Sequence, residues 1–363
     1  MTVRVLHTPG HTHTHLSYAV LDGDEPVAVF TGGSLLHGST GRPDLLGPDH
    51  TDVLVHAQWR SARRLATELP EETAVYPTHG FGSFCSASRS GAAAGTIGQE
   101  KRGNPALTRD EETYVQELLA GLDAYPAYYA HMAPANAAGP GAPDLSPPAV
   151  AGPAELRERI EAGEWVVDLR DGTAFAAGHL AGSLNFGIGG QFATYLGWLI
   201  PWGTPLTLLG ATREQVAEAQ RELVRIGIDR PAAMATGGPA EWAGDAPLGS
   251  FPRATFADLA RALAGDEAPV VLDVRRDRER AESRIAGSVH VPIHELPDRI
   301  GEVPAGPVWV HCAGGYRASI AAALLAARGH EVVAVDDAFD HARELGITTP
   351  TGQDPTGPKE KAA

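Results

Sequence analysis

The sequence predicts an α/β protein in which two copies of a parallel-sheet unit follow a separate N-terminal region. Two segments resemble each other without gaps: "WVVDLRDGTAFAAGHLAGSLNF" begins at Trp165, and "VVLDVRRDRERAESRIAGSVHV" begins at Val270, 105 residues later. A constant offset indicates duplication. Each copy alternates short apolar stretches with helical stretches, which is typical of parallel sheets covered by helices. A segment rich in Ala, Pro and Gly, residues 133–153, has the composition of a linker.

The chain of 363 residues is long enough for two or three domains. These patterns predict five segments in order: an N-terminal domain over 1–135, a linker over 136–152, a first repeat copy over 153–248, a second copy over 252–348 and a flexible tail over 349–363. "REQVAEAQRELVRIG" and "RASIAAALLAARG" supply the late helix of each copy. In the N-terminal region, Thr108 and Glu111 have the spacing of a capping box that opens an amphipathic helix.

Composition excludes several classes of function. The formal net charge of -16 argues against nucleic acid or an anionic membrane as the main partner. There is no signal-peptide pattern, and no apolar stretch approaches the roughly 18 residues of a membrane span. Two cysteines cannot form a disulfide framework. We therefore expect a cytoplasmic protein.

The second copy contains a candidate nucleophile, Cys312, where the apolar strand "PVWVH" runs into "CAGGYRAS" and a helix. Backbone N–H groups and the dipole at a helix N-terminus favour a thiolate. Gly314 and Gly315 allow the loop to curl into an anion-binding nest, and Arg317 adds a cation. The loop therefore predicts attack by a thiolate on sulfur or phosphorus. A buried structural cysteine is the alternative, and cysteine phosphatases use a similar Cys-x4-Arg cradle.

The first copy lacks this nucleophile. Aligning Pro205 with Pro307 places Gly210 opposite Cys312. Because glycine has no side chain that could attack a substrate, we expect this copy to serve packing or docking.

In the second copy, "LDVR", "IAGSVHVPI" and "CAGGYR" resemble the rhodanese sulfurtransferases over residues 252–348. The resemblance implies that Cys312 carries a persulfide, with Arg317 beside it. The backbone of Ala313, Gly314, Gly315 and Tyr316 would cradle the substrate. One departure is "SRIAGS", where the family usually has Gly-His before the isoleucine. The first copy resembles an inactive rhodanese-like module.

The N-terminal blocks "HTPGHTHTHLSY", "VFTGGSLLHGSTGRPDLLG" and "YPTHGFGSFCS" resemble a metallo-β-lactamase-fold domain of the persulfide dioxygenase kind. "TIGQEKRGNPAL" and "PAYYAHMAPANAAGP" extend the resemblance to fused dioxygenase–rhodanese proteins. It implies a partial αββα sandwich followed by two rhodanese-like α/β domains. In that family, iron is held by two histidines and one carboxylate, a facial triad with open positions.

Residue by residue, this chain matches the iron site poorly. His11 matches one ligand, but the family's aspartate falls at Gly33, and the other histidine belongs to a segment upstream of the "TPGH" block. His79 matches a histidine outside the triad. We therefore expect a degenerate metal site at His11, and the resemblance to the family is the only indication of iron. The alternative is a different metal site, because His11, His13 and His15 would share one face of a strand.

The same resemblance implies that much of the first sheet lies before the "TPGH" block. The remaining part should expose a sheet edge or an apolar face unless another chain covers it, which is compatible with a homo-oligomer. Cys85, in "GSFCS", is expected to be a small core residue rather than a second nucleophile.

The predicted function is transfer of sulfane sulfur from thiosulfate or a thiol persulfide, through a Cys312 persulfide, to a thiol-type acceptor. The partners would be these small sulfur donors and acceptors, and sulfur transfer would require no cofactor. Three alternatives remain open. They are a persulfide dioxygenase that uses iron and O2 to form sulfite, a non-catalytic sulfur-relay scaffold, and a phosphatase.

Overall fold

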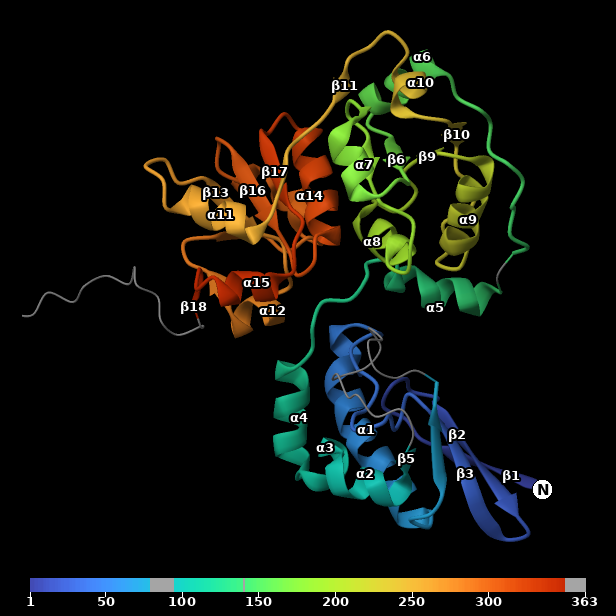
Figure 1. Cartoon of the computed structure of the whole chain (residues 1–363). Coiled ribbons are helices and arrows are strands. Elements are labelled where there is room, and N and C mark those ends of the chain that lie inside the picture. Colours follow the sequence, from blue (N-terminus) through green and yellow to red (C-terminus); the bar gives the residue numbers. More distant parts are fainter. Residues whose placement is uncertain (79–94, 140, 350–363) are drawn as a thin grey trace, which may run out of the picture. The chain divides into compact units, whose positions relative to one another are not determined.

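The computed structural model describes residues 1–78, 95–139 and 141–349 (Figure 1). The chain forms two compact units, Met1–Tyr125 and Pro126–Ala363. The predicted N-terminal domain extends to residue 135, so helix α5 (Tyr129–Ala138) falls in the second unit instead. There the ring of His131 stacks on Trp202, with 3.9 Å between centroids. Among the described helices, none combines the length and the apolar character needed to cross a membrane.

The first unit has one sheet of five strands with helices beside it (Figure 1). Its strands, in hydrogen-bonded order, are β1 (Thr2–His7), β2 (Leu16–Asp22), β3 (Glu25–Gly32), β4 (Ala74–Pro77) and β5 (Gly95–Thr96). Its helices are α1 (Pro48–Glu68), α2 (Ile97–Gly103), α3 (Pro105–Thr108) and α4 (Glu111–Ala120). Strands β3 and β4 are parallel, and the other neighbours are antiparallel. In the described residues this is one sheet with one helical layer, the partial sandwich that the sequence predicts.

The capping box predicted for α4 is wrong in its first residue. Asp110 is the N-cap, and its carboxylate accepts a hydrogen bond from Thr113 N at 2.9 Å. Thr108 instead ends α3, where its hydroxyl donates to Asn104 O at 3.0 Å. A competing helix therefore uses the residue that spacing alone assigned to the cap.

The sheet of the first unit has one buried and one exposed apolar face. Ala19, Val29 and Val75 are almost fully buried in a core that includes residues of α1. The opposite face carries a row of directly paired residues across four strands, Val5, Tyr18, Phe30 and Tyr76. These side chains are 42–55% exposed. The structure therefore shows the uncovered apolar face that the sequence predicts.

The second unit contains two parallel sheets, one for each repeat copy. The first has strand order β10-β9-β6-β8, and the second has β12-β17-β16-β13-β15. The elements of the first copy are α6 (Pro153–Glu161), β6 (Trp165–Asp168), α7 (Gly172–Ala177), β7 (His179–Leu180), β8 (Leu184–Asn185), α8 (Phe192–Leu199), β9 (Leu206–Gly210), α9 (Arg213–Val224), β10 (Ala233–Thr236), α10 (Pro239–Ala243) and β11 (Leu248–Gly249).

The second copy repeats this order with small variations. Its elements are β12 (Arg253–Ala254), α11 (Phe256–Leu263), β13 (Val270–Asp273), α12 (Asp277–Glu282), β14 (Arg284–Ile285), β15 (Val289–His290), α13 (Leu296–Arg299), the 3-10 helix η1 (Ile300–Glu302), β16 (Val308–His311), α14 (Tyr316–Ala326), β17 (Val332–Val335), α15 (Phe339–Glu344) and β18 (Thr348–Thr349). Two antiparallel pairs, β7–β11 and β14–β18, lie outside the parallel sheets.

Strand register confirms the alignment of the two copies. Asp168 pairs with Leu209 in the first sheet, and Asp273 pairs with His311 in the second. Gly210 follows Leu209 in the first copy, and Cys312 follows His311 in the second. Gly210 therefore occupies the position of the candidate nucleophile.

The two faces of β3 lead to a matched pair of predictions. Val29→Ala should lower the free energy of unfolding of the first unit by about 1–3 kcal/mol, because it removes buried apolar volume. Phe30→Ala should change stability little, because the ring is half exposed. It should instead weaken binding of an apolar fluorescent dye. Denaturant unfolding and dye titration test both, and a large stability loss for Phe30→Ala would show that this face is covered in solution.

Candidate active site

The cysteine loop joins β16 to α14. The Cys312 side chain is 1% exposed, and its Sγ accepts a hydrogen bond from Gly315 N at 3.1 Å. Gly315 has φ 89°, and a Cβ there would overlap the Asp336 carboxylate. Only glycine fits this position, so the left-handed turn aims an N–H group at the sulfur. This arrangement stabilises negative charge on the sulfur at the start of a helix.

The outer part of the cysteine loop is exposed to solvent, and a backbone hydrogen bond holds it in place. Ala313 and Gly314 are exposed, and a Cβ built on Gly314 would meet no atom within 4 Å. Ala313 O accepts a hydrogen bond from Phe339 N at 3.0 Å. The sulfur therefore lies beneath a loop that is fixed at its base and exposed at its tip.

Tyr316 and the first turn of α14 contact the first copy. The Tyr316 hydroxyl donates to Gly187 O at 3.0 Å, and its ring centroid lies 5.9 Å from that of Tyr195. Ser319 Oγ donates to Asn185 Oδ1 at 2.7 Å. Tyr316, which the resemblance assigns to substrate binding, thus has its hydroxyl engaged within the protein.

Arg317 lies in the same helix turn, 8% exposed, and forms a two-pronged ion pair with Glu279. Nη1 lies 2.6 Å from Oε2, and Nη2 lies 2.7 Å from Oε1. Burial opposes ionisation of Glu279, but the Arg317 guanidinium outweighs this effect and holds the pKa of the carboxyl at about 2. The cation predicted beside Cys312 therefore has a permanent anionic partner near neutral pH.

Glu279 is the residue that sequence reasoning missed. It is separated from Arg317 by 38 positions, and helix spacing cannot reveal such a pair. The repeat itself offered one indication of its importance. The residue of the first copy that lies 105 positions before Glu279 is Ala174. The copy without the nucleophile also lacks the carboxylate.

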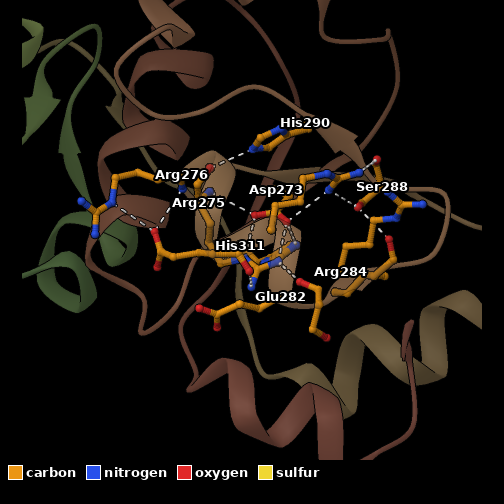
Figure 2. A network of polar contacts seen from close by, with 12 residues as sticks. Asp273, Arg275, Arg276, Glu282, Arg284, Ser288, His290 and His311 are labelled. Carbon is orange, nitrogen blue, oxygen red and sulfur yellow. Dashed lines mark hydrogen bonds and ion pairs between the residues drawn. The ribbon is translucent and has the colours of Figure 1, made fainter. Parts of the chain in front are cut away.

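A buried polar network supports the strand that precedes the loop (Figure 2). The Asp273 carboxylate accepts hydrogen bonds from Arg275 Nε at 2.9 Å and Arg275 Nη2 at 2.7 Å. Arg280 Nη1 contacts the same carboxylate at 3.2 Å. Burial raises the pKa of Asp273, but the attraction of His311 and the hydrogen bonds and charge of Arg275 outweigh this effect and hold it well below its usual range. Asp168 and Arg170 form the same pair in the first copy.

His311 belongs to this network and is fully buried. Its ring stacks on Phe339 with 5.5 Å between centroids, and Nε2 lies 3.9 Å from Asp273 Oδ2. Neither ring nitrogen has a hydrogen-bond partner among the described residues. Burial lowers the pKa of His311 to about 4, although the Asp273 carboxylate opposes the shift. The imidazole is therefore neutral near pH 7.

In the first copy, the loop between β9 and α9 forms hydrogen bonds between its own side chains and backbone where the second copy has the cysteine loop. Thr212 caps α9 by accepting from Gln215 N at 3.3 Å, in place of a glycine nest. Gln215 Oε1 accepts from Ala211 N at 2.7 Å, and Gln215 Nε2 donates to Leu169 O at 3.3 Å. An ordinary capped helix start has replaced the anion site.

The N-terminal histidines are held by hydrogen bonds within the first unit. His11 Nδ1 donates to Arg42 O at 2.9 Å. His15 Nε2 accepts from Gly33 N at 3.0 Å, and its Nδ1 lies 3.0 Å from Ser34 Oγ. Burial lowers the pKa of both imidazoles, that of His15 to about 4. His13 instead contacts His50 at 3.1 Å on the exposed surface.

These residues do not fit the iron triad. In residues 1–78, 95–139 and 141–349, no three His, Cys, Asp or Glu side chains come close enough to hold a metal ion. A Cβ at Gly33 would overlap the His11 ring, so this ring occupies the space of the family's aspartate. His79 and Cys85 lie outside the described residues.

This packing predicts the outcome of restoring the aspartate. Gly33→Asp should displace His11 and cost about 1–3 kcal/mol of stability through overpacking. It should not create an iron site, because among the residues that the structure describes no two further ligands converge there. Elemental analysis of the purified variant, with thermal unfolding, tests this. One iron per chain in the wild type or the variant would contradict it.

The buried imidazole predicts an acid sensitivity. A histidine with a lowered pKa contributes stability that is present above about pH 6.5 and lost as pH falls toward 4. His311→Leu should therefore remove on the order of 2–3 kcal/mol of the acid-induced loss between pH 7 and 4.5. Leucine should fit, because Leu209 occupies the equivalent register in the first copy.

Urea unfolding at the two pH values measures this difference. The exposed His341 provides the control, because Asp337 raises its pKa and its contribution to stability is lost as pH rises. His341→Leu should not lessen the acid sensitivity. An unchanged pH dependence in His311→Leu would show that the imidazole is charged or hydrated in the native protein.

Comparison with known proteins agrees with this division of the chain. The family described as "Rhodanese-like domain" matches residues 152–245 and 255–342, together just over half of the chain. An uncharacterized protein of Mycobacterium tuberculosis is 34% identical over 109 residues, 30% of this chain and 41% of that protein. The chain thus spans about two fifths of the length of that curated relative.

Two further matches are to proteins of the lactamase type. A lactamase-like protein of Pestalotiopsis microspora is 38% identical over 79 residues, 22% of this chain and 20% of that protein. The crystal structure of a metallo-β-lactamase from Staphylococcus aureus has TM-score 0.55 and 27% identity, and the match covers 65% of this chain and 67% of that chain. The chain therefore belongs to the rhodanese-like family, with two such domains that follow a unit of the metallo-β-lactamase fold.

Proposed function

We propose that the second rhodanese-like domain is a sulfurtransferase that carries sulfane sulfur on Cys312. The supporting observation is the loop geometry: the Gly315 N–H contacts Sγ at 3.1 Å at the start of α14. A thiolate stabilised by a helix N-terminus is a nucleophile near neutral pH. The family membership favours sulfur as its target.

The proposed reaction has two displacement steps. The Cys312 thiolate attacks the outer sulfur of a donor, thiosulfate or a thiol persulfide. The donor S–S bond breaks, and sulfite or a thiolate leaves with the electron pair, so that a Cys312 persulfide remains. An acceptor thiolate then attacks the terminal sulfur and releases the Cys312 thiolate. Atoms and electrons balance, so neither step needs a metal or another cofactor.

The Arg317 geometry disfavours a phosphatase. A cysteine phosphatase cradle needs a guanidinium whose donors are available to the phosphate oxygens. Here two nitrogens of Arg317 bind Glu279, at 2.6 and 2.7 Å. An aryl phosphate should therefore be a poor substrate.

The central prediction concerns the nucleophile. After treatment with thiosulfate, the wild type should gain the mass of one sulfur, and Cys312→Ser should gain none. Serine preserves the size of the side chain, but its hydroxyl titrates far above neutral pH and has no neighbouring general base. Intact-mass spectrometry under non-reducing conditions measures the gain.

Cys85 provides the matched control, because it is the only other cysteine of the chain. Cys85→Ser should still gain one sulfur. If Cys312→Ser gains the same mass as the wild type, the nucleophile is misassigned. If the wild type takes sulfur from neither thiosulfate nor a persulfide, the proposed function is wrong.

A further inference from the structure

The charge next to Cys312 is set by an ion pair rather than by a single cation. Arg317 and Glu279 are joined by two short hydrogen bonds, and both side chains are largely buried. The pKa of Glu279 is about 2, because the attraction of Arg317 outweighs the effect of burial. Glu279 is therefore ionised throughout the pH range in which the protein works. The pair contributes no net charge to the loop.

Glu279 is held in place independently of Arg317. It is the third residue of α12, and its Oε2 accepts a hydrogen bond from Arg276 N at 3.1 Å. Arg276 Nε lies 3.4 Å from the same oxygen. The start of α12 thus fixes the carboxylate, and the carboxylate in turn fixes the guanidinium. Arg317 cannot turn toward an incoming anion without breaking two charge-assisted hydrogen bonds.

The two copies in this chain form an internal comparison. They share the buried pairs Asp168–Arg170 and Asp273–Arg275, so these pairs follow from the scaffold. The carboxylate of Glu279 has no counterpart, because the first copy has Ala174 at the equivalent position. The copy with a nucleophile has the carboxylate, and the copy without one lacks it. This association indicates that Glu279 serves the loop rather than the fold.

We propose that Glu279 determines which sulfur donor the loop accepts, an inference that rests on the sulfurtransferase function proposed above. The carboxylate neutralises Arg317, so this pair gives an incoming anion no net attraction. The attraction that an unpaired Arg317 would exert is twice as large for the thiosulfate dianion as for a donor with one negative charge at the same distance, so its neutralisation disfavours thiosulfate more. Glu279 therefore directs the loop toward organic thiol persulfides and away from thiosulfate. Glu279 acts on Cys312 chemistry through Arg317 and is a positioning residue.

The experiment compares two donors in the full-length protein. The rate of sulfur loading onto Cys312 is followed by intact mass, with thiosulfate and with cysteine persulfide, for the wild type and Glu279→Gln. Glutamine keeps the size of the side chain and can still accept the bond from Arg276 N. We expect the thiosulfate rate to rise on the order of 3- to 10-fold relative to the persulfide rate, because a charge has been removed. Glu279→Asp, which keeps the charge, should retain the wild-type preference.

Glu155→Gln is the control for loss of a partly buried ion pair elsewhere. Glu155 pairs with Arg159 at 2.7 Å on α6 in the first copy, and its removal should leave the donor preference unchanged. A second measurement uses the same variant. Because salt screens the attraction of the unpaired Arg317, added salt should reduce the gain in the relative thiosulfate rate of Glu279→Gln.

The outcomes are distinguishable. An equal change of both rates in Glu279→Gln would mean that the carboxylate only supports the structure, and an unchanged ratio would also overturn the inference. If added salt leaves the gain of Glu279→Gln unchanged, the gain is not electrostatic and the inference is wrong. If the wild type loads from neither donor, the proposed function itself fails.

Discussion

The buried pair of Asp273 and Arg275 is the interaction on which the second rhodanese-like domain depends. It fixes the end of strand β13 to the loop that follows, with both side chains inside the protein (Figure 2). The Arg275 guanidinium also lies over the Phe339 ring, 3.6 Å from its centroid. Phe339 N in turn holds Ala313 O of the cysteine loop. Removal of one member of a buried ion pair costs about 3–5 kcal/mol. The Asp273–Arg275 pair therefore holds Phe339, and through it the cysteine loop, in place.

The first copy shows which parts of this arrangement belong to the fold and which to the chemistry. It retains the Asp168–Arg170 pair and the parallel sheet around it. One set of changes lies in a short loop, where Gly210 stands in place of the nucleophile and the side chain of Gln215 satisfies the backbone. Another lies in α7, where Ala174 stands in place of Glu279. The buried pair and the parallel strands are therefore present both with the cysteine and without it.

The sequence was sufficient to predict the repeat, the parallel sheets and the equivalence of Gly210 and Cys312. The repeat follows from a gapless offset of 105, the equivalence of Gly210 and Cys312 from the alignment of Pro205 with Pro307, and the sheets from local patterns of apolar residues, which depend on neighbours along the chain. The partner of Arg317 was not predictable in this way, because Glu279 reaches it from another helix. The cap of α4 was missed for a related reason, since a preceding helix had already taken Thr108. Long-range packing and competition between neighbouring elements cannot be predicted from the spacing of residues along the sequence.

The first unit shows how the N-terminal histidines are built into its structure. A buried imidazole must satisfy its ring nitrogens. His15 does so with Gly33 N on one nitrogen and with Ser34 Oγ on the other. The ring of His11 fills the volume that Gly33 leaves open, and its Nδ1 bonds Arg42 O. Because these contacts supply hydrogen bonds and packing, His11 and His15 join the polar and apolar contacts of this part of the first unit.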